Sequence, residues 1–353
     1  MKIWLWSGAL VRYAFGLACC SLVVGCGSDS TGPTITPQTA TLTVDASQAA
    51  AYVRLGTPAT QVSVSDPSSS NAWDLAFQAT TVTVNGGEAG PAGVLAYCIC
   101  QNAQASNDAI RTMTPDNQLA AFENVTAASI PPDSAFRGDV LNPVISGWYS
   151  GTPGPAVTPQ SSRSWIIRKG TSSPVLAKFR VIGITGATAT NAGTIEFEYA
   201  IQPSPGAPFG PVRSAQADVR GGPVYFDLTA GAPGTSSAWD LRFSGYQIRL
   251  NGGVSGPGGL SAVPDFTRPF AQIDAAYAAS APPQAYRSDS YAGVFAASPW
   301  YRYNITGTDN QIWPTFNVYL IKRGNEVFRL QIVSYYSVTG APRHITFRYA
   351  RLR

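Results

Sequence analysis

The chain has 353 residues and a net charge of +4, and only 12% of its residues are charged, about half the usual share of 25%. No dense run of basic residues occurs, which argues against a nucleic-acid partner. The 34 glycines and 27 prolines break long helices, so a helical bundle is excluded.

The first 25 residues have the pattern of an export signal. Lys2 and Arg12 precede an uncharged, mostly apolar run at 13–24, which is too short to span a bilayer. This run ends in Val-Val-Gly-Cys, which resembles the lipobox of bacterial lipoprotein signal peptides. We therefore expect a lipoprotein signal peptide at 1–25 and a lipid anchor on Cys26. The alternative is a plain secretory signal with an incidental cysteine.

The residues after Cys26 fit lipid anchoring. The segment 26–38 is polar and rich in Gly, Ser and Thr, as expected of a flexible tether. Gly27 follows the cysteine in place of Asp, which resembles lipoproteins sorted to the outer membrane. No later segment is apolar enough to cross a membrane, so we expect the acyl chains to hold the protein at the outer membrane, on the cell surface.

The remaining chain has the composition of an all-β protein. Short runs rich in Tyr, Phe, Trp, Val, Ile and Thr alternate with Gly, Pro, Asn and Ser. Trp73, Leu75 and Phe77 alternate with other residues, which places them on one buried face of a strand. Helical patterns are few and weak, at 117–125 and 271–280.

A block of 22 residues occurs twice. WDLAFQATTVTVNGGEAGPAGV at 73–94 aligns without a gap with WDLRFSGYQIRLNGGVSGPGGL at 239–260, with ten identities. Weaker matches before and after the block extend the repeat to a duplicated unit. We expect two antiparallel β domains, at 39–205 and 206–353, with the Pro-rich stretch 203–208 as the linker.

The repeated polar residues are interpreted as structural. The tryptophans are expected to fill the two cores, the aspartates to hydrogen-bond nearby turns, and the Asn-Gly-Gly triplets to end strands, because Asn and Gly accept positive φ at little cost. The set is Trp73, Asp74, Asn85, Gly86 and Gly87 in the first copy, and Trp239, Asp240, Asn251, Gly252 and Gly253 in the second.

Two other features leave alternatives open. Cys98 and Cys100 are expected on one side of a strand, either reduced or bridged, since two thiolates alone make an incomplete zinc site. Residues 27–205 carry a net charge of −4 and residues 206–353 a net charge of +6. This asymmetry could steer an anionic ligand to the second copy, or it could reflect drift on solvated faces.

The order Trp-Asp-Leu-x-Phe, seven residues, Asn-Gly-Gly and then aromatic closing strands resembles the HmuY family, here in two tandem copies. The family comprises haem-binding lipoproteins of Gram-negative bacteria. The resemblance implies an all-β protein on the outer membrane that captures haem, for iron acquisition, and passes it to an outer-membrane receptor. It also implies histidine or methionine ligands for the iron.

The ligand set departs from that pattern. After the signal segment the chain has one histidine, His344, at the start of an expected closing strand, so bis-histidine ligation is excluded. The remaining haem-ligand candidates are a thioether and three phenols, and nearby arginines could pair with the propionates. The ligand candidates are Met113, Tyr277, Tyr286 and Tyr291, and the propionate candidates are Arg268, Arg287 and Arg302.

Catalytic motifs are missing. The sequence has no Gly-x-Ser-x-Gly, no His-Glu-x-x-His and no phosphate-binding loop. We therefore expect a binding protein and not an enzyme, with no catalytic residues and no dedicated metal site. The alternative to haem binding is a surface interaction module that binds a glycan, a protein or another small ligand.

Overall fold

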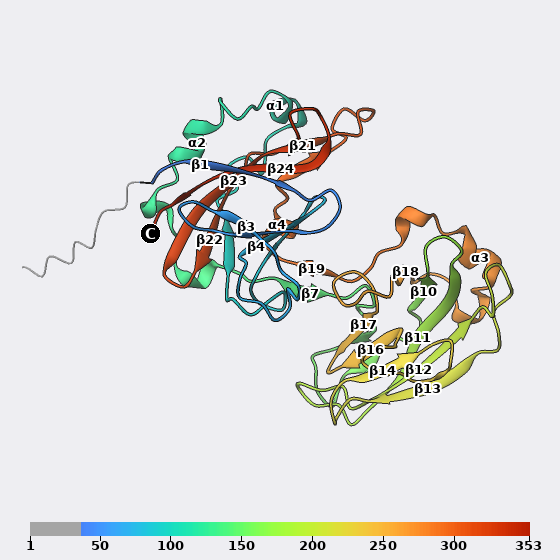
Figure 1. Ribbon diagram of the computed structural model, residues 1–353. Helices are drawn as coiled ribbons and strands as arrows, with labels where there is room; N and C mark the ends of the chain where they lie inside the picture. Colours follow the sequence, from blue (N-terminus) through green and yellow to red (C-terminus); the bar gives the residue numbers. More distant parts are fainter. Residues whose placement is uncertain (1–36) are drawn as a thin grey trace, which may run out of the picture. The chain divides into compact units, whose positions relative to one another are not determined.

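The computed structural model describes residues 37–353 (Figure 1). The expected signal peptide, Cys26 and nearly all of the tether lie outside the described residues, so lipidation stays a prediction. Among residues 37–353, no helix has the length and apolarity needed to cross a membrane.

The first copy contributes twelve strands. They are β1 (Ala40–Asp45), β2 (Ala51–Arg54), β3 (Thr60–Val62), β4 (Leu75–Gln78), β5 (Thr81–Val84), β6 (Leu95–Cys98), β7 (Val140–Asn142), β8 (Tyr149–Ser150), β9 (Thr158–Pro159), β10 (Ser164–Lys169), β11 (Val175–Thr185) and β12 (Thr194–Ile201).

The second copy repeats these twelve strands in the same order. They are β13 (Arg213–Asp218), β14 (Val224–Asp227), β15 (Ala232–Pro233), β16 (Leu241–Ser244), β17 (Gln247–Leu250), β18 (Ser261–Asp265), β19 (Ser290–Ala292), β20 (Tyr301–Tyr303), β21 (Ile312–Pro314), β22 (Val318–Arg323), β23 (Glu326–Tyr336) and β24 (Pro342–Arg351). Both large sheets are antiparallel throughout, which confirms the predicted all-β fold.

Helices are short and lie mainly between the sixth and seventh strands of each copy. The α-helices are α1 (Asn107–Arg111), α2 (Leu119–Glu123), α3 (Ala275–Ser280) and α4 (Val294–Ala297), and the 3₁₀ helices are η1 (Ala127–Ser129), η2 (Asp133–Ala135), η3 (Phe270–Gln272) and η4 (Pro283–Ala285). Helices α2 and α3 fall within the segments where helical patterns were weak but present. The side chain of Asp274 caps α3 by accepting a hydrogen bond from the backbone N–H of Tyr277.

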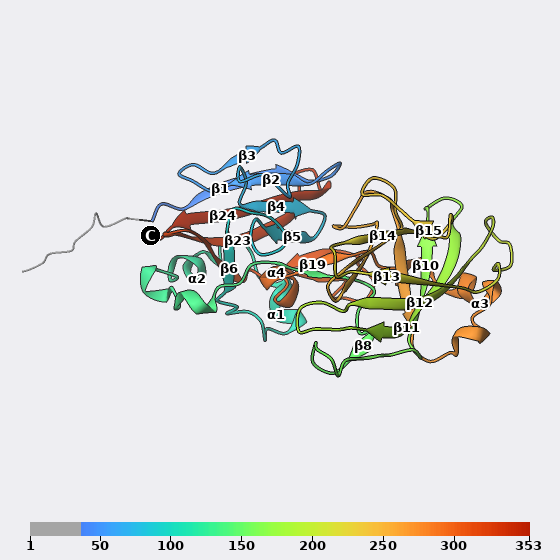
Figure 2. The ribbon, with the colours of Figure 1, turned by 90° about the horizontal axis from the view of Figure 1, so that it is seen from below.

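The two copies exchange halves. One five-stranded sheet has the order β1-β24-β23-β22-β6, and the other has the order β13-β12-β11-β10-β18. In each sheet the three central strands come from one copy and the two outer strands from the other. In Figures 1 and 2 the blue strands accordingly lie with the red ones, and the green strands with the yellow ones.

The hydrophobic cores follow this exchange. One core is built from residues 44–96 and 295–349, and the other from residues 145–262. We call the first region lobe A (residues 37–142 and 293–353) and the second lobe B (residues 143–292). Each lobe also has a four-stranded sheet, β3-β2-β4-β5 in lobe A and β15-β14-β16-β17 in lobe B.

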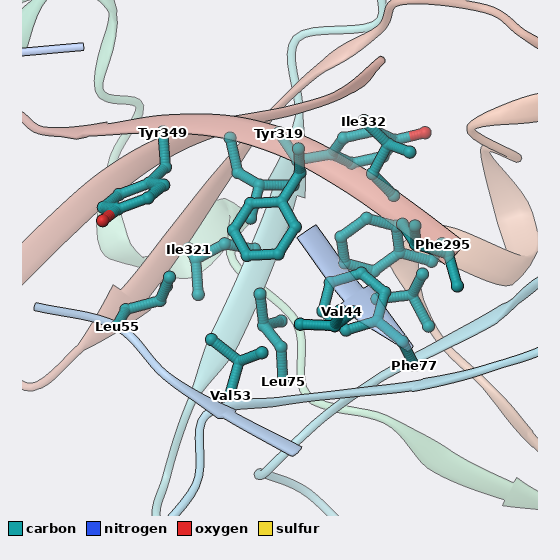
Figure 3. Close-up of a cluster of buried hydrophobic side chains, with 14 of the residues drawn as sticks. Val44, Val53, Leu55, Leu75, Phe77, Phe295, Tyr319, Ile321, Ile332 and Tyr349 are labelled. Atoms are coloured by element: carbon teal, nitrogen blue, oxygen red, sulfur yellow. The ribbon is translucent and has the colours of Figure 1, made fainter. Parts of the chain in front are cut away.

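Equivalent aromatic pairs join the copies in both lobes. Phe77 stacks on Phe347 in lobe A with ring centroids 5.2 Å apart, and Phe243 stacks on Phe197 in lobe B at 4.9 Å. Figure 3 shows the lobe A core, where Val53 and Leu75 from the first copy meet Tyr319 and other residues from the second. Burial of one such large side chain stabilises the fold by about 1.5–3 kcal/mol.

This pairing differs from the expectation that each copy closes into its own domain. The Pro-rich stretch 203–208 connects β12 to β13, and these two strands pair directly within lobe B. The chain instead passes between lobes at β7 and β19, which pair with each other in antiparallel register. The exchange is possible because equivalent strands of the two copies present the same alternation of buried residues, so either copy can complete either sheet.

Candidate functional site

The repeated aspartates form ion pairs that join the two copies. The buried carboxylate of Asp74 accepts a hydrogen bond from the N–H of Leu55 at 2.7 Å. It also forms ion pairs with Arg54 at 3.0 Å and with Arg323 of the second copy at 2.5 Å. Burial, the largest cause, raises the pKa of Asp74, while the two arginines oppose this shift. We conclude that Asp74 links the two copies within lobe A.

Asp240 makes the same links in lobe B. It accepts a hydrogen bond from the N–H of Leu228 at 3.0 Å and pairs with Lys169 of the first copy at 2.9 Å. Lys169 is the repeat equivalent of Arg323, so the exchange is reciprocal. These contacts agree with the structural role that was expected for both aspartates.

The Asn-Gly-Gly triplets form identical corners. Asn85 donates to the backbone oxygen of Trp73 at 2.9 Å, and Asn251 donates to that of Trp239 at 2.8 Å. A Cβ on Gly86 would overlap the carbonyl oxygen of Val94, and a Cβ on Gly252 would overlap that of Leu260. Gly87 and Gly253 have φ of +68° and +62°, which other residues rarely adopt.

The two repeated tryptophans are not equally buried. Trp73 is 1% exposed, whereas Trp239 is only half-buried and packs edge-on against Tyr225. Neither tryptophan belongs to the core cluster of its lobe, so neither fills a core as expected. The lobe B core is filled by the aromatic rings of Phe179, Phe197 and Phe243.

A large cavity lies between the outer face of the four-stranded sheet of lobe A and residues of lobe B around β19. It has a volume of about 480 Å³, and it is lined by Tyr52, Trp73, Ala76, Thr83 and, from β19, Tyr291 among others. Tyr52 packs edge-on against Trp73 at 5.3 Å. We call this cavity the Tyr291 cleft.

The equivalent face of lobe B carries longer side chains. The residues that correspond to Ala76 and Thr83 are Arg242 and Arg249. Arg242 lies over the ring of Tyr225, the equivalent of Tyr52, at 5.7 Å. Two long side chains thus occupy the face that is open in lobe A.

Tyr291 is the one haem-ligand candidate in this cleft. Neither its hydroxyl nor that of Tyr52 has a hydrogen-bond partner among residues 37–353. Burial raises the pKa of Tyr291, and the neighbouring Arg249 cation opposes this shift. Arg249 is also 3.6 Å from Glu88. The hydroxyl therefore has no protein partner in the described part of the chain, and Arg249 offsets part of the burial that favours the neutral phenol.

A second cavity, of about 220 Å³, lies on the other side of Tyr291 and is lined by Asp139 and Phe295 among others. Asp139 is 3% exposed and accepts one hydrogen bond, from the N–H of Val84 at 2.9 Å. Burial raises the pKa of Asp139 to about 7. Its repeat equivalent, Asp289, accepts two backbone hydrogen bonds, from Val144 and Leu250.

The other phenol candidates lie together in lobe B, away from Tyr291. The guanidinium of Arg268 covers the ring of Tyr277 at 3.8 Å. The hydroxyl of Tyr286 donates to the carbonyl of Ala278 at 3.3 Å, so it is already engaged. Arg287 donates to backbone carbonyls beside Tyr286.

Met113 and Arg302 both lie beside α1 in lobe A. Met113 is half-buried just after α1. Arg302 donates to Asn107, in the first turn of α1, at 2.8 Å. The structure thus groups the candidates into three places, and no arginine candidate lines the Tyr291 cleft.

His344 lies apart from every candidate. Its ring is 3.7 Å from Asp45, its neighbour across the β1–β24 pair. Within residues 37–353, no cluster of three or more His, Cys, Asp or Glu side chains could hold a metal ion.

The family model described as HmuY protein matches residues 47–199 and again residues 222–349. The chain belongs to the HmuY family. The predicted family and its two tandem copies are confirmed. A search of curated proteins finds no matching sequence.

Two solved structures are similar to this HmuY family member. A protein described as HmuY-like and heme-binding, from Bacteroides vulgatus, has 11% identity and a TM-score of 0.33, with 88% of this chain and 90% of that chain covered. A protein described as a lipoprotein, from Bacteroides fragilis, has 14% identity and a TM-score of 0.31, with 88% and 89% covered.

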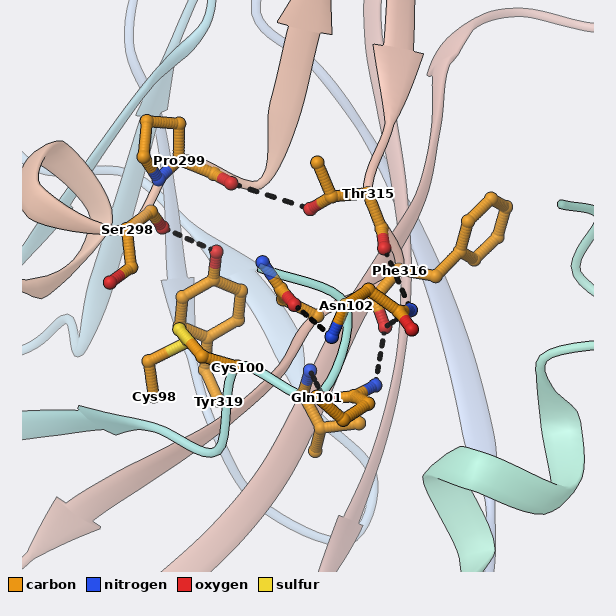
Figure 4. Close-up of a disulfide and its surroundings, with 11 residues drawn as sticks. Cys98, Cys100, Gln101, Asn102, Ser298, Pro299, Thr315, Phe316 and Tyr319 are labelled. Atoms are coloured by element: carbon orange, nitrogen blue, oxygen red, sulfur yellow. Dashed lines mark hydrogen bonds between the residues drawn. A yellow bond between two sulfur atoms is a disulfide. The ribbon is translucent and has the colours of Figure 1, made fainter. Parts of the chain in front are cut away.

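A disulfide joins Cys98 and Cys100 of this HmuY protein, which decides between the two alternatives left open by the sequence. The loop after it binds the second copy. Gln101 donates to the carbonyl of Phe316 at 2.8 Å and accepts from the N–H of Val318 at 3.0 Å (Figure 4). The disulfide thus lies at a junction between the exchanged halves.

Sequence reasoning missed Tyr52, Asp139 and Arg249 as residues of the site. Asp139 and Asp289 occur in the repeated pattern Arg-x-Asp, so alignment of the copies could have found them. Tyr52 was recognised only as a repeat landmark. Their convergence on Tyr291 depends on the exchange, which no local pattern reveals.

Proposed function

We propose that this protein is a surface lipoprotein of the HmuY family that binds haem or a related porphyrin without bis-histidine ligation and does not act as an enzyme. Family membership supports a haem-binding type of protein. The observation that carries the proposal is the Tyr291 cleft, where a hydroxyl without a protein partner faces a large cavity between the aromatic residues Tyr52 and Trp73.

Tyr291 fits the role of an iron ligand. A phenolate can ligate ferric haem, and the nearby Arg249 would favour the phenolate when the proton leaves. Tyr52, which is only half-buried, would contact the porphyrin plane, and the buried Trp73 would support the ring of Tyr52 from behind. Because no Lys or Arg lines the cleft, we expect the propionates to face solvent at its mouth. Met113 is the alternative donor and would place haem at α1.

Haemin titration of the chain, followed by absorbance, tests this proposal. We expect a Soret shift without the low-spin bis-histidine spectrum. Tyr291→Phe should weaken haemin binding tenfold or more, since loss of a strong ligand corresponds to about 1.4 kcal/mol or more. Tyr286→Phe is the matched control and should have no effect.

Two results would count against haem at this cleft. If Met113→Ala alters the spectrum and Tyr291→Phe does not, the iron binds at α1. If micromolar haemin gives no Soret shift, the chain is not a haem protein.

A neutral small ligand, such as a glycan, is the second candidate for the same cleft. It is favoured by the cleft's lining, which combines aromatic rings, free hydroxyls and no cation. Ala76→Arg would reproduce Arg242 of lobe B and should block the cleft for either ligand. A glycan-array signal that this variant abolishes would support the second candidate.

Attachment to the outer membrane through Cys26 is part of the proposal, with transfer of haem to an outer-membrane receptor as its purpose. Mass spectrometry of the mature protein should show an acylated cysteine at its amino terminus. Cys26→Ala should release the protein to the soluble fraction. Unchanged membrane association of that variant would contradict lipid anchoring.

A further inference from the structure

A further cavity, in lobe B, is lined by a single cation whose equivalent in lobe A is paired with a carboxylate. It has a volume of about 330 Å³ and is lined by Arg168, Leu176, Pro205, Ala279, Pro283 and Tyr286, among others. This volume is at the small end of the range for ligand sites. No acidic side chain lines it, and Arg168 supplies its only cation.

The duplicated sequence shows what neutralises this cation elsewhere. Lys322 is the lobe A equivalent of Arg168, and it pairs with Asp133 at 2.6 Å. It also lies 5.8 Å from the ring centre of Phe136, just as Arg168 lies 5.8 Å from that of Tyr286. In both lobes the cation therefore sits over an equivalent aromatic ring.

Lobe B lacks an equivalent of the Asp133 carboxylate. Asp133 is the first residue of η2, and the equivalent first residue of η4 is Pro283. Arg168 has no carboxylate partner within residues 37–353. Its Nη2 donates to the carbonyl of Thr171 at 2.8 Å, and its Nε is buried without a partner. The Pro in place of Asp thus leaves a guanidinium with unused donors beside an apolar cavity.

We propose that this cavity binds a small monocarboxylate with an apolar body. The ligand carboxylate would take the place of Asp133 and pair with Arg168, for which a planar carboxylate is a well-matched partner. Its apolar body would lie against Leu176, Ala279 and Pro283. The site is separate from the Tyr291 cleft and does not depend on haem binding.

Fluorine NMR of the full-length mature chain with 4-fluorobenzoate tests the site, and 4-fluorobenzamide is the neutral probe of the same shape. The amide should bind about tenfold or more weakly, because hydrogen bonds to charged groups are the stronger ones. Arg168→Gln should weaken fluorobenzoate binding to the same extent.

Two further variants use the comparison between lobes. Pro283→Asp restores the carboxylate found in lobe A and should abolish fluorobenzoate binding while the protein keeps its melting temperature. Lys322→Gln is the matched control and should leave binding unchanged. Tyr291→Phe should also leave it unchanged, which separates this site from the proposed haem site.

Equal binding of the acid and the amide would overturn the proposal. So would undiminished binding to Arg168→Gln, or no binding of fluorobenzoate to the parent chain at millimolar concentration.

Discussion

Lobes A and B are built from equivalent strands, yet their surfaces are chemically different. On the outer face of the four-stranded sheet, lobe A has Ala76 and Thr83, which line a cavity, where lobe B has two arginines. On the side covered by helices, Lys322 of lobe A pairs with Asp133, whereas the equivalent Arg168 of lobe B has no carboxylate partner among residues 37–353. The shared core thus determines the fold, while a few outward-facing positions decide which face can hold a ligand.

The largest expected effect on stability comes from expressing parts of the chain separately. Residues 143–292 contain the whole lobe B core without interruption, so this fragment should give a β-type circular dichroism spectrum and a cooperative melt. Residues 38–203 and 208–353 each carry half of both cores. Each should melt at a much lower temperature, if it folds at all. If the two copies, expressed separately, each melt at the temperature of the parent chain, then each copy can form a complete domain without the other.

Cross-linking tests the exchange in the intact chain. Leu95 in β6 lies opposite Lys322 in β22, so Leu95→Cys with Lys322→Cys should form a disulfide that peptide mapping detects. Leu95→Cys with Arg168→Cys is the matched control, because Arg168 is the partner that β6 would have within one copy. A cross-link only in the second pair would contradict the exchange.

Removal of the aspartate that links the copies should be more costly in lobe A. Asp74→Ala removes a buried acceptor shared by the N–H of Leu55 and the cations of Arg54 and Arg323, although Arg323 keeps Glu326 and the carbonyl of Leu55. The change should lower the free energy of unfolding by about 3–5 kcal/mol. Asp240→Ala should lower it by about 1–3 kcal/mol, because Lys169 is 36% exposed and can be hydrated. Urea denaturation measures both, and equal losses would show that the two links are equivalent.

The two aspartates beside the crossover should differ in pH dependence. The pKa of Asp139 is about 7 in the folded protein and about 3.9 when unfolded, so its ionisation destabilises the fold as pH rises from about 4 to 7. Asp139→Asn should therefore be more stable than the parent by about 1–3 kcal/mol at pH 8 and near the parent at pH 4.

Asp289→Asn is the control for that measurement. The variant loses one of the two carboxylate oxygens that accept from the N–H groups of Val144 and Leu250, and should be less stable than the parent. Burial raises the pKa of Asp289 too, but these hydrogen bonds and Arg249 oppose the shift, so its stability difference should change less with pH than that of Asp139→Asn. If the stability difference between Asp139→Asn and the parent does not change with pH, then Asp139 does not titrate near neutral pH.

The smallest effect is expected for the disulfide, which lobe B lacks. Its loop is very short, so Cys98→Ser with Cys100→Ser should reduce stability by about 1.5 kcal/mol or less. Reduction of the parent with dithiothreitol should give the same shift in the urea midpoint. A much larger loss would mean that the loop anchored by Gln101 depends on the disulfide.

The sequence by itself determined the β class, the duplication, the family and the conformation of the Asn-Gly-Gly corners. These properties depend on local patterns: alternation of apolar residues, and glycines where a Cβ would overlap a carbonyl. The same patterns did not reveal that Trp239 is half-buried, because its exposure depends on what packs over lobe B. They placed Tyr291 among the candidates but did not distinguish it from Tyr277 or Tyr286.

Only the tertiary structure decided which copy completes which sheet. Strands β10 and β22 have equivalent patterns, so β6 can pair with either, and no local preference distinguishes the two. Two contacts between the copies favour the observed pairing: β7 pairs with β19, and Asp74 forms an ion pair with Arg323 of the other copy. This pairing also brings Tyr52 and Tyr291, which are distant in sequence, to one cleft. The site forms when strands that are distant in the sequence choose between partners of similar sequence. Sequence patterns cannot reveal this choice, because its free energy depends on tertiary contacts and not on secondary-structure propensity or periodicity.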